Sequence, residues 1–315
     1  MERRATDGAC TDTALRQEGG FALPSARPRR IYRLPSGKEL TIGAKSLVMG
    51  ILNVTPDSFS DGGKWNTLDK ALAHALQMVE DGADIIDIGA ESSRPGFVPV
   101  GAEEELSRLA PFLERIAPEI PVPLSIDTFK AETAREALRL GADILNDIWG
   151  LQYAQETRGA MARIAAEKGA PVVVMHNRKD THYAKDIIAT MKDFFRESIS
   201  IADAAGLSRE LLLLDPGIGF GKEPAANLIV LHRLAELAEL DGERYPLLLG
   251  ASRKSFIGYA LGLPVEERLE ATGAACVLGM AAGCSVLRVH DVKPVVRMCR
   301  MADAILEGRK YAGQD

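Results

Sequence analysis

The stretch ADIIDIGAE (83–91) is a short apolar run that follows a glycine and ends in a charged residue. Such a run is typical of a buried parallel strand, because a strand covered on both faces carries apolar residues almost without interruption. Similar runs recur along the chain and are separated by stretches with helical periodicity: SLVMGILN (46–53), VPLSID (122–127), ADILND (142–147), PVVVMH (171–176), LLLLD (211–215), PLLLGAS (246–252) and CSVLRVH (284–290). Eight strands alternating with helices predict an α/β fold, the (β/α)₈ TIM barrel.

Polar residues stand at or just beyond the ends of these runs. A TIM barrel builds its active site at the carboxyl ends of its strands. We therefore expect one mouth to be lined by Asn53, Glu91, Asp127, Asn146, His176, Asp215, Arg253 and His290.

The N-terminal segment differs from the predicted barrel in composition. Residues 1–30 are rich in Arg, Pro, Gly and small residues and lack the apolar core of a secretory signal, which predicts a disordered or loosely attached arm. The next segment, IYRLPSGKELTIG (31–43), predicts a short β-hairpin that turns at Ser36-Gly37 and closes the floor of the barrel. We assign residues 31–310 to one barrel domain.

The composition of the chain limits which binding partners and which cellular compartment are expected. The net charge of −6 and an aromatic content of 5% argue against a nucleic-acid partner, which calls for a basic face or stacking aromatics. No apolar run approaches the roughly 20 residues that cross a bilayer, so no membrane contact is expected. The four cysteines form no C-x-x-C pair, which fits a reducing cytoplasm.

The segment after the first predicted strand, VTPDSFSDGGKW (54–65), carries acidic residues and paired glycines. Asn53, Asp57 and Asp61 are oxygen ligands of the kind that Mg²⁺ prefers, so they could hold a divalent cation on a substrate phosphate. An ordinary polar surface loop would have the same composition.

Asp127, Asn146 and Asp215 end three of the predicted strands. Carboxylates deep in a barrel require hydrogen-bond partners, and a heterocycle with an amidine-like edge would supply them. The alternative is a set of structural contacts, for instance an ion pair between Asp127 and Lys254.

Cationic residues follow the last two predicted strands. Ser252-Arg253-Lys254-Ser255 opens a predicted helix, and Arg288 and His290 end the eighth run. The loops after strands 7 and 8 form the phosphate site in many TIM barrels, so with Arg94 these residues predict an anionic substrate. The alternative is that Arg288 and His290 pair with a nearby acid such as Asp291.

Taken together, these segments resemble the dihydropteroate synthases of folate biosynthesis, over about residues 46 to 302. The motifs that carry the resemblance occur in the family's order: GILNVTPDSFSDGG (50–63), DIIDIGAESSRPG (84–96), SIDTFK (125–130), NDI (146–148), VVMHNR (173–178), LDPGIGFGK (214–222), GASRKSF (250–256) and RVHDV (288–292). The family's second motif usually reads GGESTRPG, so Ala90 and Ser93 depart from it.

The resemblance implies a pterin-binding TIM barrel that joins 6-hydroxymethyl-7,8-dihydropterin diphosphate to 4-aminobenzoate and releases pyrophosphate. It also implies Mg²⁺ as cofactor, a homodimer and a target of sulfonamides, although the motifs leave drug sensitivity open. Two other functions stay open on the residues alone. They are a methyltetrahydrofolate–corrinoid methyltransferase and a non-catalytic pterin-binding barrel.

The resemblance also implies roles for individual residues. The catalytic group is Asp61, Arg94, Asp127, Lys254 and Arg288. The pterin would contact Asp127, Asn146, Asp215 and Lys254, with Arg288 against the ring. Ile148, Met175 and Gly250 would also bind substrate. The diphosphate would contact Asn53, Arg94, Arg288 and His290, with Asn53 also as the metal ligand. The aminobenzoate carboxylate would meet Ser255, and its ring would lie near Phe59, Pro95 and Phe220. Ser93 would also bind substrate.

Overall fold

The computed structural model describes residues 27–54, 64–91 and 100–307. Within them, eight parallel strands close into a barrel: β3 (Leu47–Asn53), β4 (Ile85–Gly89), β5 (Leu124–Asp127), β6 (Ile144–Asp147), β7 (Val172–Met175), β8 (Leu212–Asp215), β11 (Leu247–Leu249) and β12 (Cys284–Val289). β12 pairs with β3 and so closes the ring between the last and first barrel strands. The predicted TIM barrel is confirmed.

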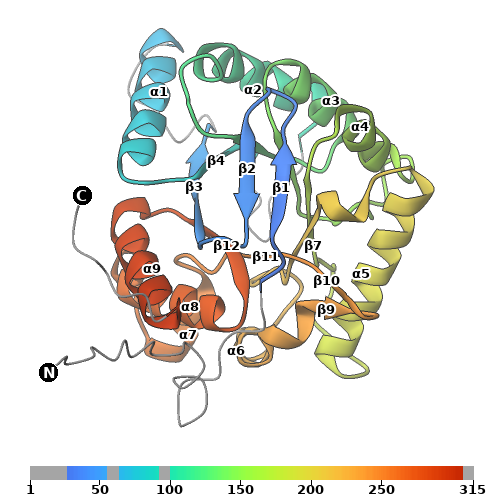
Figure 1. Ribbon diagram of the computed structural model, residues 1–315, viewed down its shortest axis with the longest axis vertical. Helices are drawn as coiled ribbons and strands as arrows, with labels where there is room; N and C mark the ends of the chain where they lie inside the picture. Colours follow the sequence, from blue (N-terminus) through green and yellow to red (C-terminus); the bar gives the residue numbers. More distant parts are fainter. Residues whose placement is uncertain (1–26, 55–63, 92–99, 308–315) are drawn as a thin grey trace, which may run out of the picture.

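Helices surround the barrel (Figure 1). They are α1 (Lys64–Glu80), α2 (Ala102–Ile116), α3 (Ala131–Arg139), α4 (Ala160–Lys168), α5 (Ile187–Ala204), α6 (Pro224–His232), α7 (Ser255–Leu261), α8 (Leu269–Ala281) and α9 (Val292–Glu307). Their buried faces and the outer faces of the strands form the main apolar cluster. In the described part of the chain, no helix is long and apolar enough to cross a membrane.

Two helix boundaries differ from what the residue pattern predicts. Thr67 is a typical N-cap residue before an apolar periodic stretch, but α1 already begins at Lys64, so Thr67 lies inside it. The apolar pattern NLIVLHRLAELAEL (227–240) predicts a helix to Leu240, but α6 ends at His232 and is followed by a 3₁₀ turn and the short strands β9 (Glu239–Leu240) and β10 (Glu243–Arg244). The turn residues between these strands, Asp241 and Gly242, have φ of 52° and 82°. An Asp-Gly pair with positive φ is a strong hairpin signal, which outweighed the apolar pattern here.

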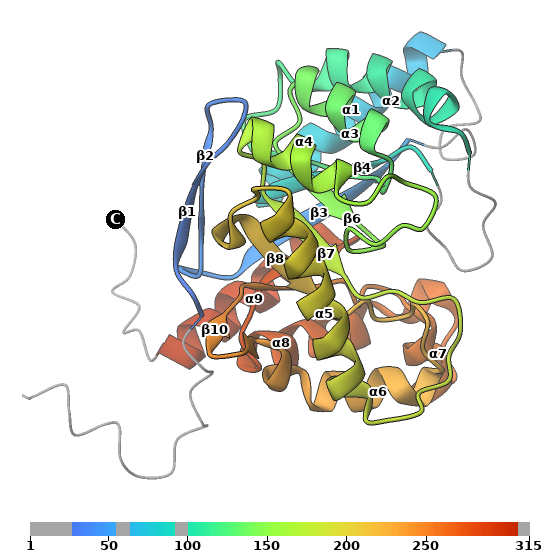
Figure 2. The same ribbon diagram turned by 90° about the vertical axis from the view of Figure 1, so that its right-hand side faces the viewer.

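The predicted floor hairpin is confirmed. Strands β1 (Arg30–Arg33) and β2 (Glu39–Ile42) pair antiparallel, and Figure 2 shows them against one end of the barrel. Tyr32, Leu34, Leu40 and Ile42 join an apolar cluster with inward-facing residues near the strand starts, such as Met49. The hairpin therefore seals the end of the barrel opposite the strand carboxyl ends.

Two arginines tie this floor to the barrel. The Arg30 guanidinium donates to the carbonyl oxygens of Arg209, Glu210, Leu212 and Arg244. The Arg27 guanidinium lies 3.3 Å from Asp303 on α9. Residues 27–30 of the predicted arm therefore contact the barrel, while residues 1–26 lie outside the described residues.

The floor hairpin supplies a stability test. Ile42→Ala removes a side chain that is 0% exposed, so we expect a loss of about 2–5 kcal/mol in the free energy of unfolding by urea titration. Ile31→Ala is the matched control in the same hairpin, because Ile31 is 58% exposed and its truncation should change stability by less than about 0.5 kcal/mol. If both variants lose the same free energy of unfolding, Ile42 does not contribute to stability by closing the end of the barrel.

Candidate functional site

A buried cluster of charges lies at the carboxyl ends of β4, β5 and β12. The Arg288 Nε atom lies 2.6 Å from Asp87 Oδ2, and its Nη2 atom lies 2.8 Å from Asp127 Oδ2. Asp127 thus pairs with Arg288, and not with Lys254 as the structural alternative supposed. Burial acts to lower the Arg288 pKa, but the Asp87 and Asp127 carboxylates outweigh it and raise the pKa, so the guanidinium stays charged.

Two carboxyl groups of this mouth are poorly solvated. Burial raises the pKa of Asp127 to about 7, against the opposing effect of Arg288. Burial also raises the pKa of Asp215, although Lys254 and the Gly217 N–H, which donates to Asp215 Oδ1 at 2.7 Å, act the other way. The hydrogen bonds and charges around the two carboxylates therefore do not fully offset their desolvation, so further N–H donors would stabilise them.

Lys254 approaches the mouth from the N-cap of α7. Its Nζ donates to the carbonyl oxygen of Ile218 and lies 4.7 Å from the Phe220 ring centroid. Burial lowers its pKa to about 8. Gly219 makes room for this side chain, since a Cβ there would lie 3.2 Å from Lys254 Cδ. A Cβ at Gly250 would lie 3.8 Å from Lys254 Nζ, so Gly250 borders the same space.

Apolar side chains form one wall of the mouth. Ile148 and Met175 are buried in one cluster with Phe129, and Phe220 packs against that cluster. These residues come from the ends of β5, β6, β7 and β8, so four strand ends contribute to a single apolar surface. Such a surface suits the faces of flat, aromatic ligands.

His290 does not contribute a positive charge as the sequence predicted. Its Nδ1 lies 3.0 Å from Ser252 Oγ. Partial desolvation, followed by Arg288 and Arg253, lowers the pKa of His290, so the ring is neutral at pH 7. Asp291 is taken by Arg253, whose Nε lies 2.8 Å from it, and so is not the partner of Arg288 or His290.

Asn53 lies exposed at the end of β3, and Ser255 is exposed at the start of α7. A Cβ added at Gly89 would lie 3.8 Å from Asn53 Oδ1 and 3.6 Å from Asp127 Cβ, so Asn53 borders the same space as Asp127. Among the described residues, no group of three His, Cys, Asp or Glu side chains forms a metal cage. Asn53 supplies one oxygen ligand of the kind that Mg²⁺ prefers, and the other candidate ligands, Asp57 and Asp61, lie outside the described residues.

Six predicted site residues fall outside the described residues. They are Asp57, Phe59, Asp61, Ser93, Arg94 and Pro95.

Lys222 and His176 form a buried contact that the sequence pattern did not predict. Lys222 Nζ is buried 2.9 Å from His176 Nδ1 and donates to the carbonyl oxygens of Gly217 and Phe220. Burial lowers the pKa of Lys222 to about 7, and burial with Lys222 lowers that of His176 well below its usual value, so His176 is the neutral acceptor. Through its bonds to the Gly217 and Phe220 carbonyl oxygens, Lys222 holds the backbone between Asp215 and Phe220 in place.

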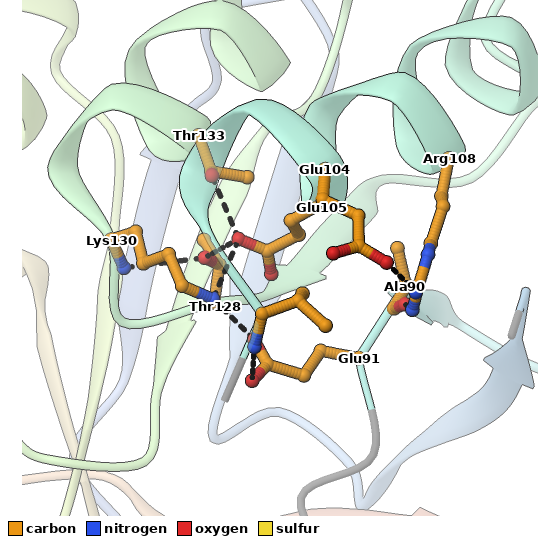
Figure 3. A network of polar contacts seen from close by, with 9 residues as sticks. Ala90, Glu91, Glu104, Glu105, Arg108, Thr128, Lys130 and Thr133 are labelled. Atoms are coloured by element: carbon orange, nitrogen blue, oxygen red, sulfur yellow. Dashed lines mark hydrogen bonds and ion pairs between the residues drawn. The ribbon is translucent and has the colours of Figure 1, made fainter. Parts of the chain in front are cut away.

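A second missed network lies beside the mouth (Figure 3). Lys130 Nζ lies between the carboxylates of Glu91, at the end of β4, and Glu105, on α2. Glu105 Oε2 also accepts from Thr128 and Thr133, and Glu91 Oε1 accepts from the Val100 N–H. The network joins the carboxyl end of β4 to α2 and to the start of α3.

The model of the pterin-binding enzyme family matches residues 49–290. The dihydropteroate synthase of Bacillus subtilis is 51% identical over 276 residues, which span 88% of this chain and 93% of that protein. The chain belongs to the dihydropteroate synthase family.

Solved dihydropteroate synthases share the barrel. The Xanthomonas albilineans enzyme with 4-aminobenzoic acid superposes with a TM-score of 0.80 at 42% identity, over 89% of this chain and 98% of that one. The same enzyme in complex with 7,8-dihydropteroate gives a TM-score of 0.77 at 41% identity, over 88% and 98% of the two chains. The family resemblance inferred from the motifs is confirmed.

The buried Lys130 pair of this dihydropteroate synthase barrel supplies a second stability test. Lys130→Met leaves two buried carboxylates without their cation, so we expect a loss of about 3–5 kcal/mol in the free energy of unfolding. Arg135→Met is the control, because its ion pair with Glu167 is exposed (58% and 55%) and should contribute less than about 1 kcal/mol. Urea titration of both variants measures the free energy of unfolding. If Lys130→Met loses no more stability than Arg135→Met, Lys130 does not stabilise the barrel through Glu91 and Glu105.

Proposed function

We propose that this barrel condenses 6-hydroxymethyl-7,8-dihydropterin diphosphate with 4-aminobenzoate to give 7,8-dihydropteroate and pyrophosphate. The observation that carries the proposal is the set of buried acceptors at the mouth, Asp127, Asn146 and Asp215, in a chain 51% identical to a dihydropteroate synthase. The relatives that match this chain are dihydropteroate synthases, which favours the synthase over a corrinoid methyltransferase or a non-catalytic barrel.

The pterin is the ligand that these acceptors favour. Its N–H and NH₂ groups would donate to Asp215, Asp127 and Asn146, which meets the demand of poorly solvated oxygens. Lys254 would donate to the carbonyl edge of the ring. Ile148 and Met175 support the flat faces of the ring, because they belong to the apolar wall beside those acceptors.

The diphosphate end would lie against Asn53, Arg94, Arg288 and His290. Arg288 supports this assignment because both neighbouring carboxylates keep it charged. His290 would serve as a neutral hydrogen-bond donor. Mg²⁺ held by Asn53 together with phosphate oxygens would supply charge neutralisation to the leaving group.

The chemistry we propose is a dissociative substitution. The bond between the pterin methylene carbon and the diphosphate oxygen breaks first, and the carbocation spreads over the ring beside Asp127 and Asp215. The amine nitrogen of 4-aminobenzoate then bonds to the methylene carbon and afterwards releases its proton to solvent. Exclusion of water would protect the cation. Because the amine loses its proton only after the bond forms, no strong general base is required.

The second substrate would lie at the rim. The position of Phe220 supports this assignment, because Lys254 Nζ lies over its ring and the ring packs against the apolar wall of the mouth. Ser255 would bind the carboxylate, and Phe59, Ser93 and Pro95 would complete the contact. A sulfonamide that mimics 4-aminobenzoate would compete for the same place.

We also propose a homodimer in a reducing cytoplasm. Exposed apolar side chains on α8 and α9, with Leu278 at 70%, Met301 at 63% and Ile305 at 60%, support a partner surface. Cys276, Cys284 and Cys299 are free thiols, which supports the compartment.

The direct test mixes the purified protein with Mg²⁺, the dihydropterin diphosphate and 4-aminobenzoate and measures pyrophosphate. We expect release that depends on both substrates. Asp215→Asn should lower kcat/KM by about 10- to 100-fold, the size expected for hydrogen bonds to a charged group. Absence of release with the unaltered protein would overturn the function, and full activity of Asp215→Asn would remove Asp215 from the pterin site.

A second expectation concerns pH. Asp127, with a pKa raised to about 7 by burial, takes up a proton as the pH falls below 7 and can then no longer accept two hydrogen bonds. Affinity for the dihydropterin diphosphate should therefore fall as pH falls, by at most about tenfold per pH unit for one proton. Titration calorimetry between pH 5.5 and 8 measures this, and a constant affinity across that range would contradict it.

A further inference from the structure

We propose that Asp87 is a positioning residue that sets which atoms of Asn146 and Arg288 face the pterin. The inference rests on the proposed function, because the pterin is the ligand of that mouth. Asp87 does not itself need to touch the substrate. It acts through two side chains that do.

Three strands send donors to this one carboxylate. Asp87 is fully buried in β4. Its Oδ1 accepts from Ser125 Oγ of β5 at 2.6 Å, and its Oδ2 accepts from Asn146 Nδ2 of β6 at 3.2 Å and from Arg288 Nε of β12 at 2.6 Å. Each donor comes from a different strand: β5 is next to β4 in the barrel, whereas β6 and β12 each lie two strands away, on opposite sides of β4.

The first consequence is the orientation of the Asn146 amide. An ionised carboxylate only accepts hydrogen bonds, so Asn146 must turn its NH₂ group toward Asp87. The Oδ1 atom of Asn146 is then the atom left for a ligand. Together with Asp127 and Asp215, it makes a set of acceptors only, which fits a ring edge that carries N–H donors. A reversed amide would offer a donor to that edge and would be mismatched.

The second consequence is the plane of the Arg288 guanidinium. Asp87 holds Nε and Asp127 holds Nη2, so two carboxylates on neighbouring strands fix the planar group from two sides. Preorganised charge of this kind acts on a leaving group without reorganisation during the reaction. Arg288 therefore reaches its place before substrate arrives.

The test is Asp87→Asn in the full-length protein. The amide can donate as well as accept, so it no longer dictates the orientation of Asn146 and no longer balances Arg288. We expect the KM for the dihydropterin diphosphate to rise by about 10- to 100-fold, as for lost hydrogen bonds to a charged group. The KM for 4-aminobenzoate should change by less than about twofold, because its proposed contacts are elsewhere.

Asp143→Asn is the matched control. Asp143 is also fully buried in the barrel wall, but it lies at the start of β6, where it accepts from the Leu124 and Ser36 N–H groups. This variant should lower thermal stability and leave both KM values unchanged. Equal effects of the two variants on the pterin KM would show that Asp87 acts only through stability and would overturn the proposal.

The pH profile separates positioning from stability. Arg288 and Lys254 lower the pKa of Asp127, whereas Asp87 and Glu105 raise it. Loss of the Asp87 charge should therefore move the acidic limb of pterin binding to lower pH. An acidic limb at the same pH as in the unaltered protein would contradict the electrostatic part of the role.

If Asp87→Asn does not fold, the Nε–H signal of Arg288 in the unaltered protein, assigned with Arg288→Lys, should exchange with solvent far more slowly than that of exposed Arg135. Equal exchange rates would overturn the proposal. If the unaltered protein releases no pyrophosphate, the proposed function fails, whereas an active protein with an unchanged pterin KM in Asp87→Asn overturns only the role of Asp87.

Discussion

Closure of the parallel barrel is the constraint on which the rest of this structure depends. Once β12 pairs with β3, the carboxyl ends of all the strands share one rim, and their last side chains must meet there. The opposite end cannot remain open, because it would expose the inward apolar residues near the strand starts. The β1–β2 hairpin covers them and leaves the chemistry to one side of the molecule.

The mouth that results is crowded with charges that burial penalises. Arg288 lies between Asp87 and Asp127, and Lys130 lies between Glu91 and Glu105, so each cation offsets carboxylates on other elements. Asp127 and Asp215 still have raised pKa values. In the proposed function, the N–H donors of the pterin would offset the desolvation of these two carboxylates.

Much of this arrangement could be predicted from residues alone. The apolar runs placed the strands, and their polar ends placed Asp127, Asn146 and Asp215 at the mouth. Asp87 was missed because it stands inside an apolar run, where a carboxylate flanked by Ile86 and Ile88 was the available signal. The contact between His290 Nδ1 and Ser252 Oγ could not be foreseen either, since it joins residues that follow two different strands.

The sequence by itself determined the barrel, the family and the residues that meet at the mouth, because strand periodicity and local motifs are properties of neighbouring positions. Only the tertiary structure decided which charge pairs with which. Arg288 and Asp87 are 201 residues apart, and their contact depends on the register of β12 against β3 and of β3 against β4. Periodicity within one strand sets which face a side chain occupies, but the partner across the barrel is set by closure.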